Sequence, residues 1–188
     1  SAGTETFTTV SLFVVTPAGA LVADGQGNRE ETQRLVQTIA GITPQPIRHV
    51  VVCSDHGDHT AGNAAFPSTA TVYAHPTSRG VMAAAFARSE GRGGSTPPAP
   101  VPTVDVTDKT VLTLGGTEIQ LLFLGRAHTG GDLHVYVPRA GLLFMSEAYL
   151  NRVFPAMRSA YASEWVRVLD RALAMDIDTK GMNRSAAW

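Results

Sequence analysis

Short apolar runs alternate with helix-like segments along most of the chain, and this alternation constrains the fold more than any other feature of the sequence. Residues 47–53, IRHVVVC, form a continuous apolar run that is typical of a buried strand. Apolar side chains recur at helical spacing in residues 29–42 before it, and a second helical segment is predicted at residues 76–90. Residues 110–116 and 117–125 predict a hairpin closed by two glycines. The chain is therefore expected to be an α/β protein in which helices cover sheets.

Length and composition favour one globular domain that spans residues 1–188. The 188 residues are 44% hydrophobic and 16% charged, which is enough to build a substantial core. The net charge of −1 argues against partners such as nucleic acid or an anionic membrane. No apolar stretch approaches the ~18 residues of a membrane span, so a soluble protein is expected. A single cysteine excludes an internal disulfide and leaves the compartment open between cytoplasm and periplasm.

Metal-ligand residues occur in three loops, each of which follows an apolar strand-like run. The first loop carries His56, Asp58 and His59, the second carries His128, and the third carries Glu147. Strand ends can hold such side chains rigidly, and imidazole nitrogens and carboxylate oxygens are the ligands that zinc accepts. These residues are therefore the candidate metal ligands, and a polar, hydrogen-bonded turn is the alternative interpretation.

These three loops resemble the motifs of the metallo-β-lactamase superfamily. SDHGDHTAGN at residues 54–63 is similar to the family's His-x-His-x-Asp-His motif and the turn that follows it. AHTGGD at residues 127–132 and LFMSE at residues 143–147 are similar to the next two landmarks, in the same order. ALVADGQGN at residues 20–28 resembles the turn after the family's second strand. The resemblance implies a four-layer αββα sandwich with the site at the edge of the sheets.

The same resemblance implies a metal-dependent hydrolase that uses activated water on a small-molecule ester, thioester, lactone or β-lactam. His56 and His128 would bind one ion, while Asp58, His59 and Glu147 would complete or bridge a second site. Asp58 would also orient the water and accept its proton. The implied cofactor is Zn²⁺, as one or two ions, with iron and manganese as the other candidates.

The site motifs depart from the family pattern at two positions. Ser54 stands where the family has its first histidine, and Glu147 stands where the family usually has aspartate. A hydroxyl is a poor substitute for imidazole as a zinc ligand. Because the first histidine is missing, the metal site is expected to be weaker than in the family. Asp55 and His75 are the two candidates that could replace the missing ligand.

The end of the chain departs from the family pattern as well. No histidine follows His134, and residues 179–188 read TKGMNRSAAW where the resemblance implies a final strand, a Gly-His-Gly turn and a helix. The fold is therefore expected either to be truncated there or to carry a foreign tail in place of the last strand and helix. A homo-oligomer in which a second copy covers the open edge is the corresponding partner expectation.

Three functions thus remain open: a hydrolase, a non-catalytic relative that binds a metal or a small molecule, and a self-association module.

Asp132 is expected to orient the His128 loop through hydrogen bonds. His49 and His134 are interpreted as outward-facing or hydrogen-bonded side chains of strands. Arg126 is interpreted as a structural arginine, with contact to an anionic substrate group as the alternative. The Gly- and Pro-rich segment 91–100 is expected to border the substrate cleft.

Overall fold

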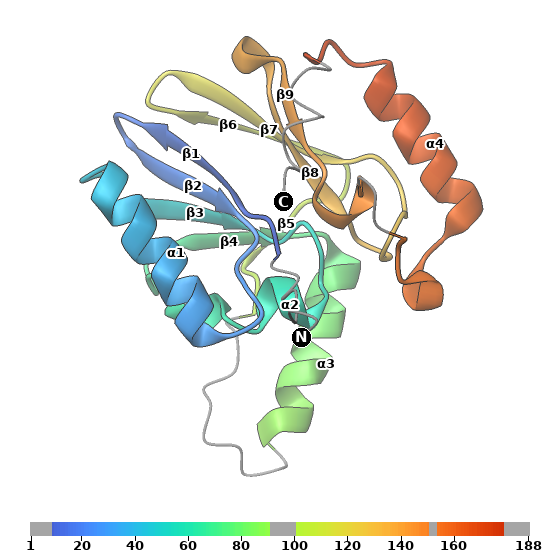
Figure 1. Ribbon diagram of the computed structural model, residues 1–188, viewed down its shortest axis with the longest axis horizontal. Coiled ribbons are helices and arrows are strands. Elements are labelled where there is room, and N and C mark those ends of the chain that lie inside the picture. Colours follow the sequence, from blue (N-terminus) through green and yellow to red (C-terminus); the bar gives the residue numbers. More distant parts are fainter. Residues whose placement is uncertain (1–8, 91–100, 151–153, 179–188) are drawn as a thin grey trace, which may run out of the picture.

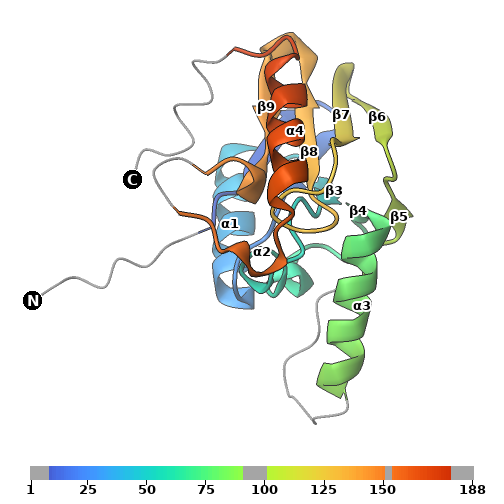
Figure 2. The ribbon, with the colours of Figure 1, turned by 90° about the vertical axis from the view of Figure 1, so that its right-hand side faces the viewer.

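Two sheets pack face to face between helices in the computed structural model, which describes residues 9–90, 101–150 and 154–178. Figure 1 shows α1 on the outer side of the first sheet and α4 on the outer side of the second. In the perpendicular view α4 lies over β8 and β9 (Figure 2). The expected four-layer αββα sandwich is therefore confirmed.

The first sheet has five strands in the order β1-β2-β3-β4-β5. β1 and β2 form an antiparallel hairpin, and the other neighbours are parallel. Parallel pairing requires crossover connections, and α1 and α3 are among the segments that connect these strands. The strands are β1 (Leu12–Thr16), β2 (Gly19–Ala23), β3 (Ile47–Val51), β4 (Thr71–Ala74) and β5 (Val104–Asp105).

The second sheet is an antiparallel meander of four strands in the order β6-β7-β8-β9. The expected hairpin is present, and Gly115 and Gly116 form its turn with φ of 55° and 80°, values that favour glycine. The strands are β6 (Lys109–Leu114), β7 (Thr117–Phe123), β8 (Leu133–Val137) and β9 (Leu142–Phe144).

Two of the longer helices, α1 and α3, have the bounds predicted from the sequence, residues 29–42 and 76–90. The helices are α1 (Arg29–Ile42), α2 (Gly57–Thr60), α3 (Pro76–Glu90) and α4 (Ala162–Leu173), and the 3₁₀ turns are η1 (Asn63–Ala65), η2 (Pro138–Ala140), η3 (Ser146–Ala148) and η4 (Met157–Ser159). Asn28 caps α1, because its side chain accepts a hydrogen bond from the backbone N–H of Glu31. None of the helices within the described residues is long and apolar enough to cross a membrane.

Three apolar clusters hold the layers together. One lies between the sheets and includes Leu21, Leu121 and Leu133. A second lies between the first sheet and its helices, and a third packs α4, through Trp165 and Val168, against the second sheet. Burial of these side chains supplies the main stabilisation of such a sandwich, at roughly 25 cal/mol per Å² of apolar surface.

Two hydrogen bonds tie the last described residues to the second sheet. The backbone N–H of Asp178 donates to the carbonyl of Gly141, just before β9, at 2.7 Å. The hydroxyl of Tyr136 donates to the carbonyl of Asp176, also at 2.7 Å. The tail at residues 179–188 and residues 91–100 of the expected cleft loop lie outside the described residues.

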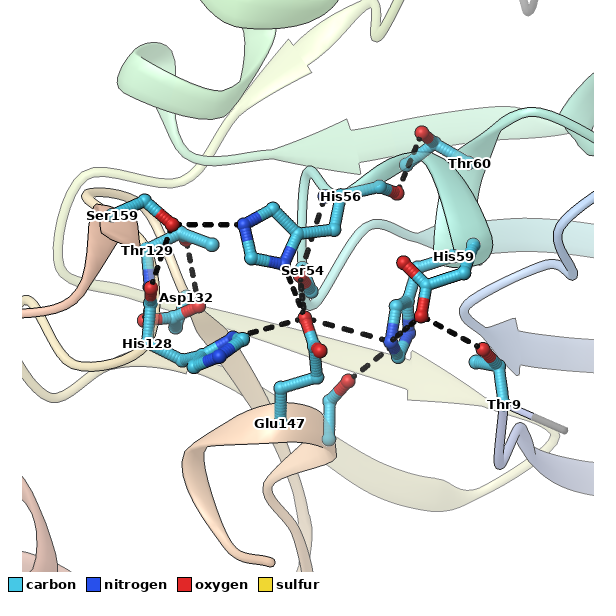
Figure 3. A network of polar contacts seen from close by, with 12 residues as sticks. Thr9, Ser54, His56, His59, Thr60, His128, Thr129, Asp132, Glu147 and Ser159 are labelled. Carbon is cyan, nitrogen blue, oxygen red and sulfur yellow. Dashed lines mark hydrogen bonds and ion pairs between the residues drawn. The ribbon is translucent and has the colours of Figure 1, made fainter. Parts of the chain in front are cut away.

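The fold brings the candidate ligand loops to one rim of the sandwich. β2 and β3 are parallel, so the loops after Ala23 and Val51 both leave the first sheet at the carboxyl ends of its strands. The loop before β8 and the turn after β9 belong to the second sheet and approach the same rim, where they meet the loop after β3 (Figure 3). Residues distant in sequence therefore meet there.

Candidate metal centre

The first ligand loop is a single short turn packed tightly against its surroundings. His56 precedes α2, and α2 itself carries Asp58 and His59. Gly62 follows, and a Cβ atom at this position would lie 1.9 Å from Thr32 Oγ1, so only glycine fits. This close approach to α1 fixes the turn and, with it, the direction of the ligand side chains.

The carboxylate of Glu147 lies at the centre of the site (Figure 3). Its Oε2 atom is 2.9 Å from His56 Nδ1, 3.1 Å from His128 Nδ1 and 3.5 Å from His59 Nε2. The Ser54 hydroxyl donates a hydrogen bond to the same oxygen at 2.6 Å. Three imidazoles and a hydroxyl, all but His128 from the loop after β3, therefore converge on one oxygen atom.

His128 is held by the loop that precedes β8. Asp132 accepts hydrogen bonds from the backbone N–H groups of Ala127 and Thr129 and from the Thr129 hydroxyl, at 3.2, 2.8 and 2.7 Å. The expected orienting role of Asp132 is therefore confirmed. The His128 ring is buried, and its contact with Glu147 is not aligned as a hydrogen bond. Neither ring nitrogen has a hydrogen-bond partner among the described residues.

His59 is oriented from behind by a residue absent from the predicted site. Asp24 Oδ2 lies 3.0 Å from His59 Nδ1, which leaves Nε2 facing Glu147. The Ser146 hydroxyl donates to the same Asp24 oxygen at 2.5 Å. Asp24 and Ser146 are the non-glycine residues with positive φ, at 62° and 48°, in the described chain. Backbone strain thus occurs at both residues that support His59.

His56 has an analogous partner in the segment before α4. Its Nε2 atom lies 2.9 Å from Ser159 Oγ, and Ser159 Oγ lies 3.4 Å from the carbonyl of His128. When Nε2–H donates to Ser159, Nδ1 presents its lone pair to the centre of the site. Sequence reasoning missed Asp24, Ser146 and Ser159. Asp24 alone gave a signal, because it follows a strand as the predicted ligands do.

The pKa values reflect this mutual attraction. Burial tends to raise the pKa of Glu147, but contacts with the three histidines and Ser54 hold it well below its usual range. Burial also tends to lower the pKa of His59, yet its interactions with Asp24 and Glu147 raise it to about 10. The hydrogen bond to Glu147 is the main cause of a raised pKa at His56. The protein thus keeps an anionic carboxylate beside a protonated His59, and a cation that binds this nitrogen must displace its proton.

Two overlapping groups of side chains have the geometry of metal ligands. His56, His128 and Glu147 form one, and Asp58, His59 and Glu147 form the other; within each group the ligand atoms lie within 4.8 Å of one another. These five residues are the predicted set, and Glu147 is shared, as a bridging carboxylate would be.

The two proposed replacements for the first histidine do not belong to either group. The ring of His75 stacks on Phe123 at 4.1 Å, and its Nδ1 accepts a hydrogen bond from the backbone of Thr77. Asp55 is likewise outside both groups. Ser54 is fully buried, and its hydroxyl contacts Glu147.

Two other interpretations are settled by the contacts of the side chains. Arg126 forms a double hydrogen bond with Glu164 and lies 4.2 Å above the Tyr161 ring, which supports the structural interpretation. His49 lies 3.2 Å from the Tyr73 hydroxyl, as a hydrogen-bonded strand residue should. The prediction for His134 was wrong, because it is fully buried and neither ring nitrogen has a partner among the described residues. It lies on the face of β8 opposite Leu133 and Val135, which is the face that α4 covers (Figure 2).

A pocket of about 360 Å³ opens above the carboxylate. Its lining consists of His56, Gly57, Asp58, His128, Glu147, Ala156, Arg158 and Ser159. Among these described lining residues, Arg158 alone carries a fixed positive charge, and its side chain is exposed. The pocket therefore combines ligand-type groups at its base with one cation in its wall.

A comparison with protein families agrees with this geometry. The family model described as "Metallo-beta-lactamase superfamily" matches residues 5–180. The chain belongs to this superfamily. Membership supports a metal-dependent hydrolase in general, and the candidate ligand groups make metal binding plausible. No curated protein matches the chain significantly.

Solved metallo-β-lactamases share the fold. One from Pontibacter korlensis is 22% identical in sequence and has a TM-score of 0.73. The match covers 91% of this chain and 76% of the Pontibacter korlensis chain. Metallo-β-lactamase IND-7 has a TM-score of 0.72 and 20% identity, covering 89% and 73%. An enzyme from Erythrobacter litoralis has a TM-score of 0.68 and 20% identity, covering 93% and 82%. At these identities the similarity concerns the fold.

Proposed function

We propose that this member of the superfamily is a zinc-dependent hydrolase of a small ester, thioester, lactone or β-lactam. The observation that carries the proposal is the pair of ligand groups that share Glu147 beneath an open pocket. A catalytic zinc ion takes three protein ligands and keeps one position for water or substrate. Each group offers three ligand atoms, so the donor set fits one ion or two.

The support around the histidines also fits a metal. Asp24 engages Nδ1 of His59 and Ser159 engages Nε2 of His56, and each leaves the other nitrogen directed at Glu147. Such partners commonly set the tautomer of metal-ligating histidines. The buried nitrogens of His128 have no hydrogen-bond partner among the described residues, and a bound cation would satisfy the one that faces the site.

The chemistry divides between the cation and the chain. A zinc ion supplies Lewis acidity and lowers the pKa of a bound water molecule toward about 7. Asp58 is placed to accept a proton, because its side chain is 61% exposed and its Oδ2 lies 3.7 Å from His59 Nε2. Arg158 would orient a substrate that carries an anionic group.

The decisive experiment combines metal analysis with turnover. Protein purified without chelator should contain about one or two equivalents of zinc and should cleave at least one member of an ester, thioester, lactone and β-lactam panel. His56→Ala should lose both properties. His75→Ala is the matched control, because its ring stacks on Phe123 outside both ligand groups, and it should retain both.

The outcomes also separate the second candidate function. Zinc binding without turnover across the panel would support the non-catalytic metal-binding relative, for which the hydroxyl of Ser54 at the first histidine position is the favouring observation. Neither metal nor turnover would overturn the proposal.

A further inference from the structure

The two positions at which the site motifs depart from the family pattern are in direct contact. Ser54 Oγ donates to Glu147 Oε2 at 2.6 Å, although 93 residues separate them in the chain. The same hydroxyl oxygen accepts a hydrogen bond from the backbone N–H of His56 at 3.3 Å. The hydroxyl thus joins the first ligand loop to the shared carboxylate.

The role of Ser54 follows from how its hydroxyl is used. Its proton is committed to Glu147 and a lone pair to His56, and the residue is fully buried. A hydroxyl so engaged is not presented to a cation as a ligand. It can instead fix the direction of the Glu147 carboxylate, whose other oxygen has no such anchor in the site network.

The small side chain of Ser54 also leaves room for the Glu147 carboxylate. In a histidine with the same χ1, Cγ would take the place of Ser54 Oγ, and the ring would extend beyond it. That atom would already be about 2.6 Å from Glu147 Oε2, closer than the ~3.5–4.0 Å of ordinary contacts. An imidazole in that rotamer at position 54 and the carboxylate in its present place therefore exclude each other.

We propose that Ser54 is a positioning residue that holds the longer Glu147 side chain in the space of the absent imidazole, so that Glu147 completes the His56–His128 ligand group. The two departures from the family motif, serine at position 54 and glutamate at position 147, then depend on each other. The inference rests on the proposed function, because it concerns the zinc site of that hydrolase.

Zinc affinity, measured by competition with a chromophoric chelator, tests the positioning role. Ser54→Ala should weaken zinc binding about 10- to 100-fold, as loss of a partner behind a ligand does. Ser54→Thr keeps a hydroxyl and should retain most of the affinity. Thr16→Val removes a buried hydroxyl that donates to Gly19 at the β1–β2 turn and should have no effect on affinity. Thermal melting of the metal-free proteins shows whether a loss of affinity is merely a loss of fold.

The coupling is tested by a double-mutant cycle. Ser54→His and Glu147→Asp should each weaken zinc binding at least about tenfold, and the double variant should recover about tenfold or more over Ser54→His. Additive losses would overturn the coupling.

The outcomes distinguish this inference from the proposed function. Ser54→Ala with affinity within about twofold of the parent, or an equal loss in Ser54→Thr, would overturn the positioning role. In that case zinc binding and turnover by the parent protein would leave the hydrolase proposal standing. A folded parent protein that binds no zinc would overturn both.

Discussion

One buried histidine lies at the rim of the sandwich and another lies on β8 beneath α4. Their neighbours differ, although the ring of the first, His128, also lies edge-on to Trp165 of α4. His128 is 1% exposed and His134 is 0% exposed, and neither has a hydrogen-bond partner among the described residues. His128 faces Glu147 and lies edge-on to His56, with ring centroids 4.8 Å apart. His134 lies on the sheet face that α4 covers with apolar side chains. Burial without a partner thus indicates a ligand only where other donors converge.

The same two regions each use an arginine differently. Arg126 donates hydrogen bonds to Glu164 of α4 and lies over the Tyr161 ring. It therefore holds α4 against the loop that precedes β8. Arg158 lines the pocket above the ligand groups. The comparison predicts that changes at the rim alter binding and turnover, whereas changes under α4 alter stability.

The largest effect is expected from removing the two buried histidines in turn. His128→Ala should weaken zinc binding at least about 100-fold, because one of three ligands in its group is lost. His134→Leu should leave zinc affinity unchanged, since no other candidate ligand accompanies His134 in the described structure. Isothermal titration of both variants with zinc measures the contrast. Equal losses would break the distinction between the regions.

The next effect concerns acid stability. Burial lowers the pKa of His134 to about 4, whereas an unfolded histidine has a pKa of about 6.5. Because the folded state favours the neutral ring, its contribution is complete above about pH 6.5 and is lost as the pH falls toward 4. When the pH is lowered from 7 to 4.5, the free energy of unfolding should therefore decrease by about 2–3 kcal/mol less in His134→Leu than in the parent protein. Urea unfolding at both pH values tests this, and parallel losses would contradict it.

A smaller effect is expected at Ser146, whose hydroxyl donates to Asp24 behind His59. Ser146→Ala should destabilise the fold by about 2 kcal/mol, because a partly buried hydrogen bond to a carboxylate is lost while the strained backbone remains. Ser146→Gly loses the same bond but accommodates φ of 48° and should cost about 1 kcal/mol less. Chemical denaturation of the metal-free proteins compares them. Equal losses would indicate that backbone strain is unimportant at this residue.

The smallest effect is expected at the two arginines. Arg158→Ala should raise KM for a carboxylated ester about fivefold, which corresponds to about 1 kcal/mol, and should leave a neutral ester of the same acyl group unaffected. Arg126→Ala should change neither KM value, because its partner is Glu164. Steady-state kinetics with the substrate pair decides the point. Equal responses to both substrates would exclude Arg158 from charge recognition.

The fold and the five predicted ligand positions could be foreseen because the signals are local. Continuous apolar runs indicated the strands, helical spacing indicated α1, and a helix-like segment that begins with Pro76 indicated α3. The ligand residues follow strand-like runs, so the meeting of three loops at one rim followed from the sheet arrangement. The family resemblance supplied the order of the sheets, which periodicity alone does not determine.

The partners behind the ligands could not be foreseen in the same way. Ser146 and Ser159 are ordinary serines in irregular segments, and only the folded backbone brings them to Asp24 and His56. The burial of His134 was missed for a related reason. A strand covered on both faces has no alternating pattern, so the polar ring in β8 gave no sign of its environment.

The placement of Glu147 has a practical consequence for handling the protein. Because this carboxylate lies within 3.5 Å of a nitrogen of each of the three histidines, removal of a cation leaves an anion among the rings and not a cluster of rings alone. We therefore expect the molecule to survive dialysis against a strong chelator with its architecture preserved. A single batch could then be reconstituted in turn with zinc, iron or manganese, so that the preferred ion is identified without differences between preparations.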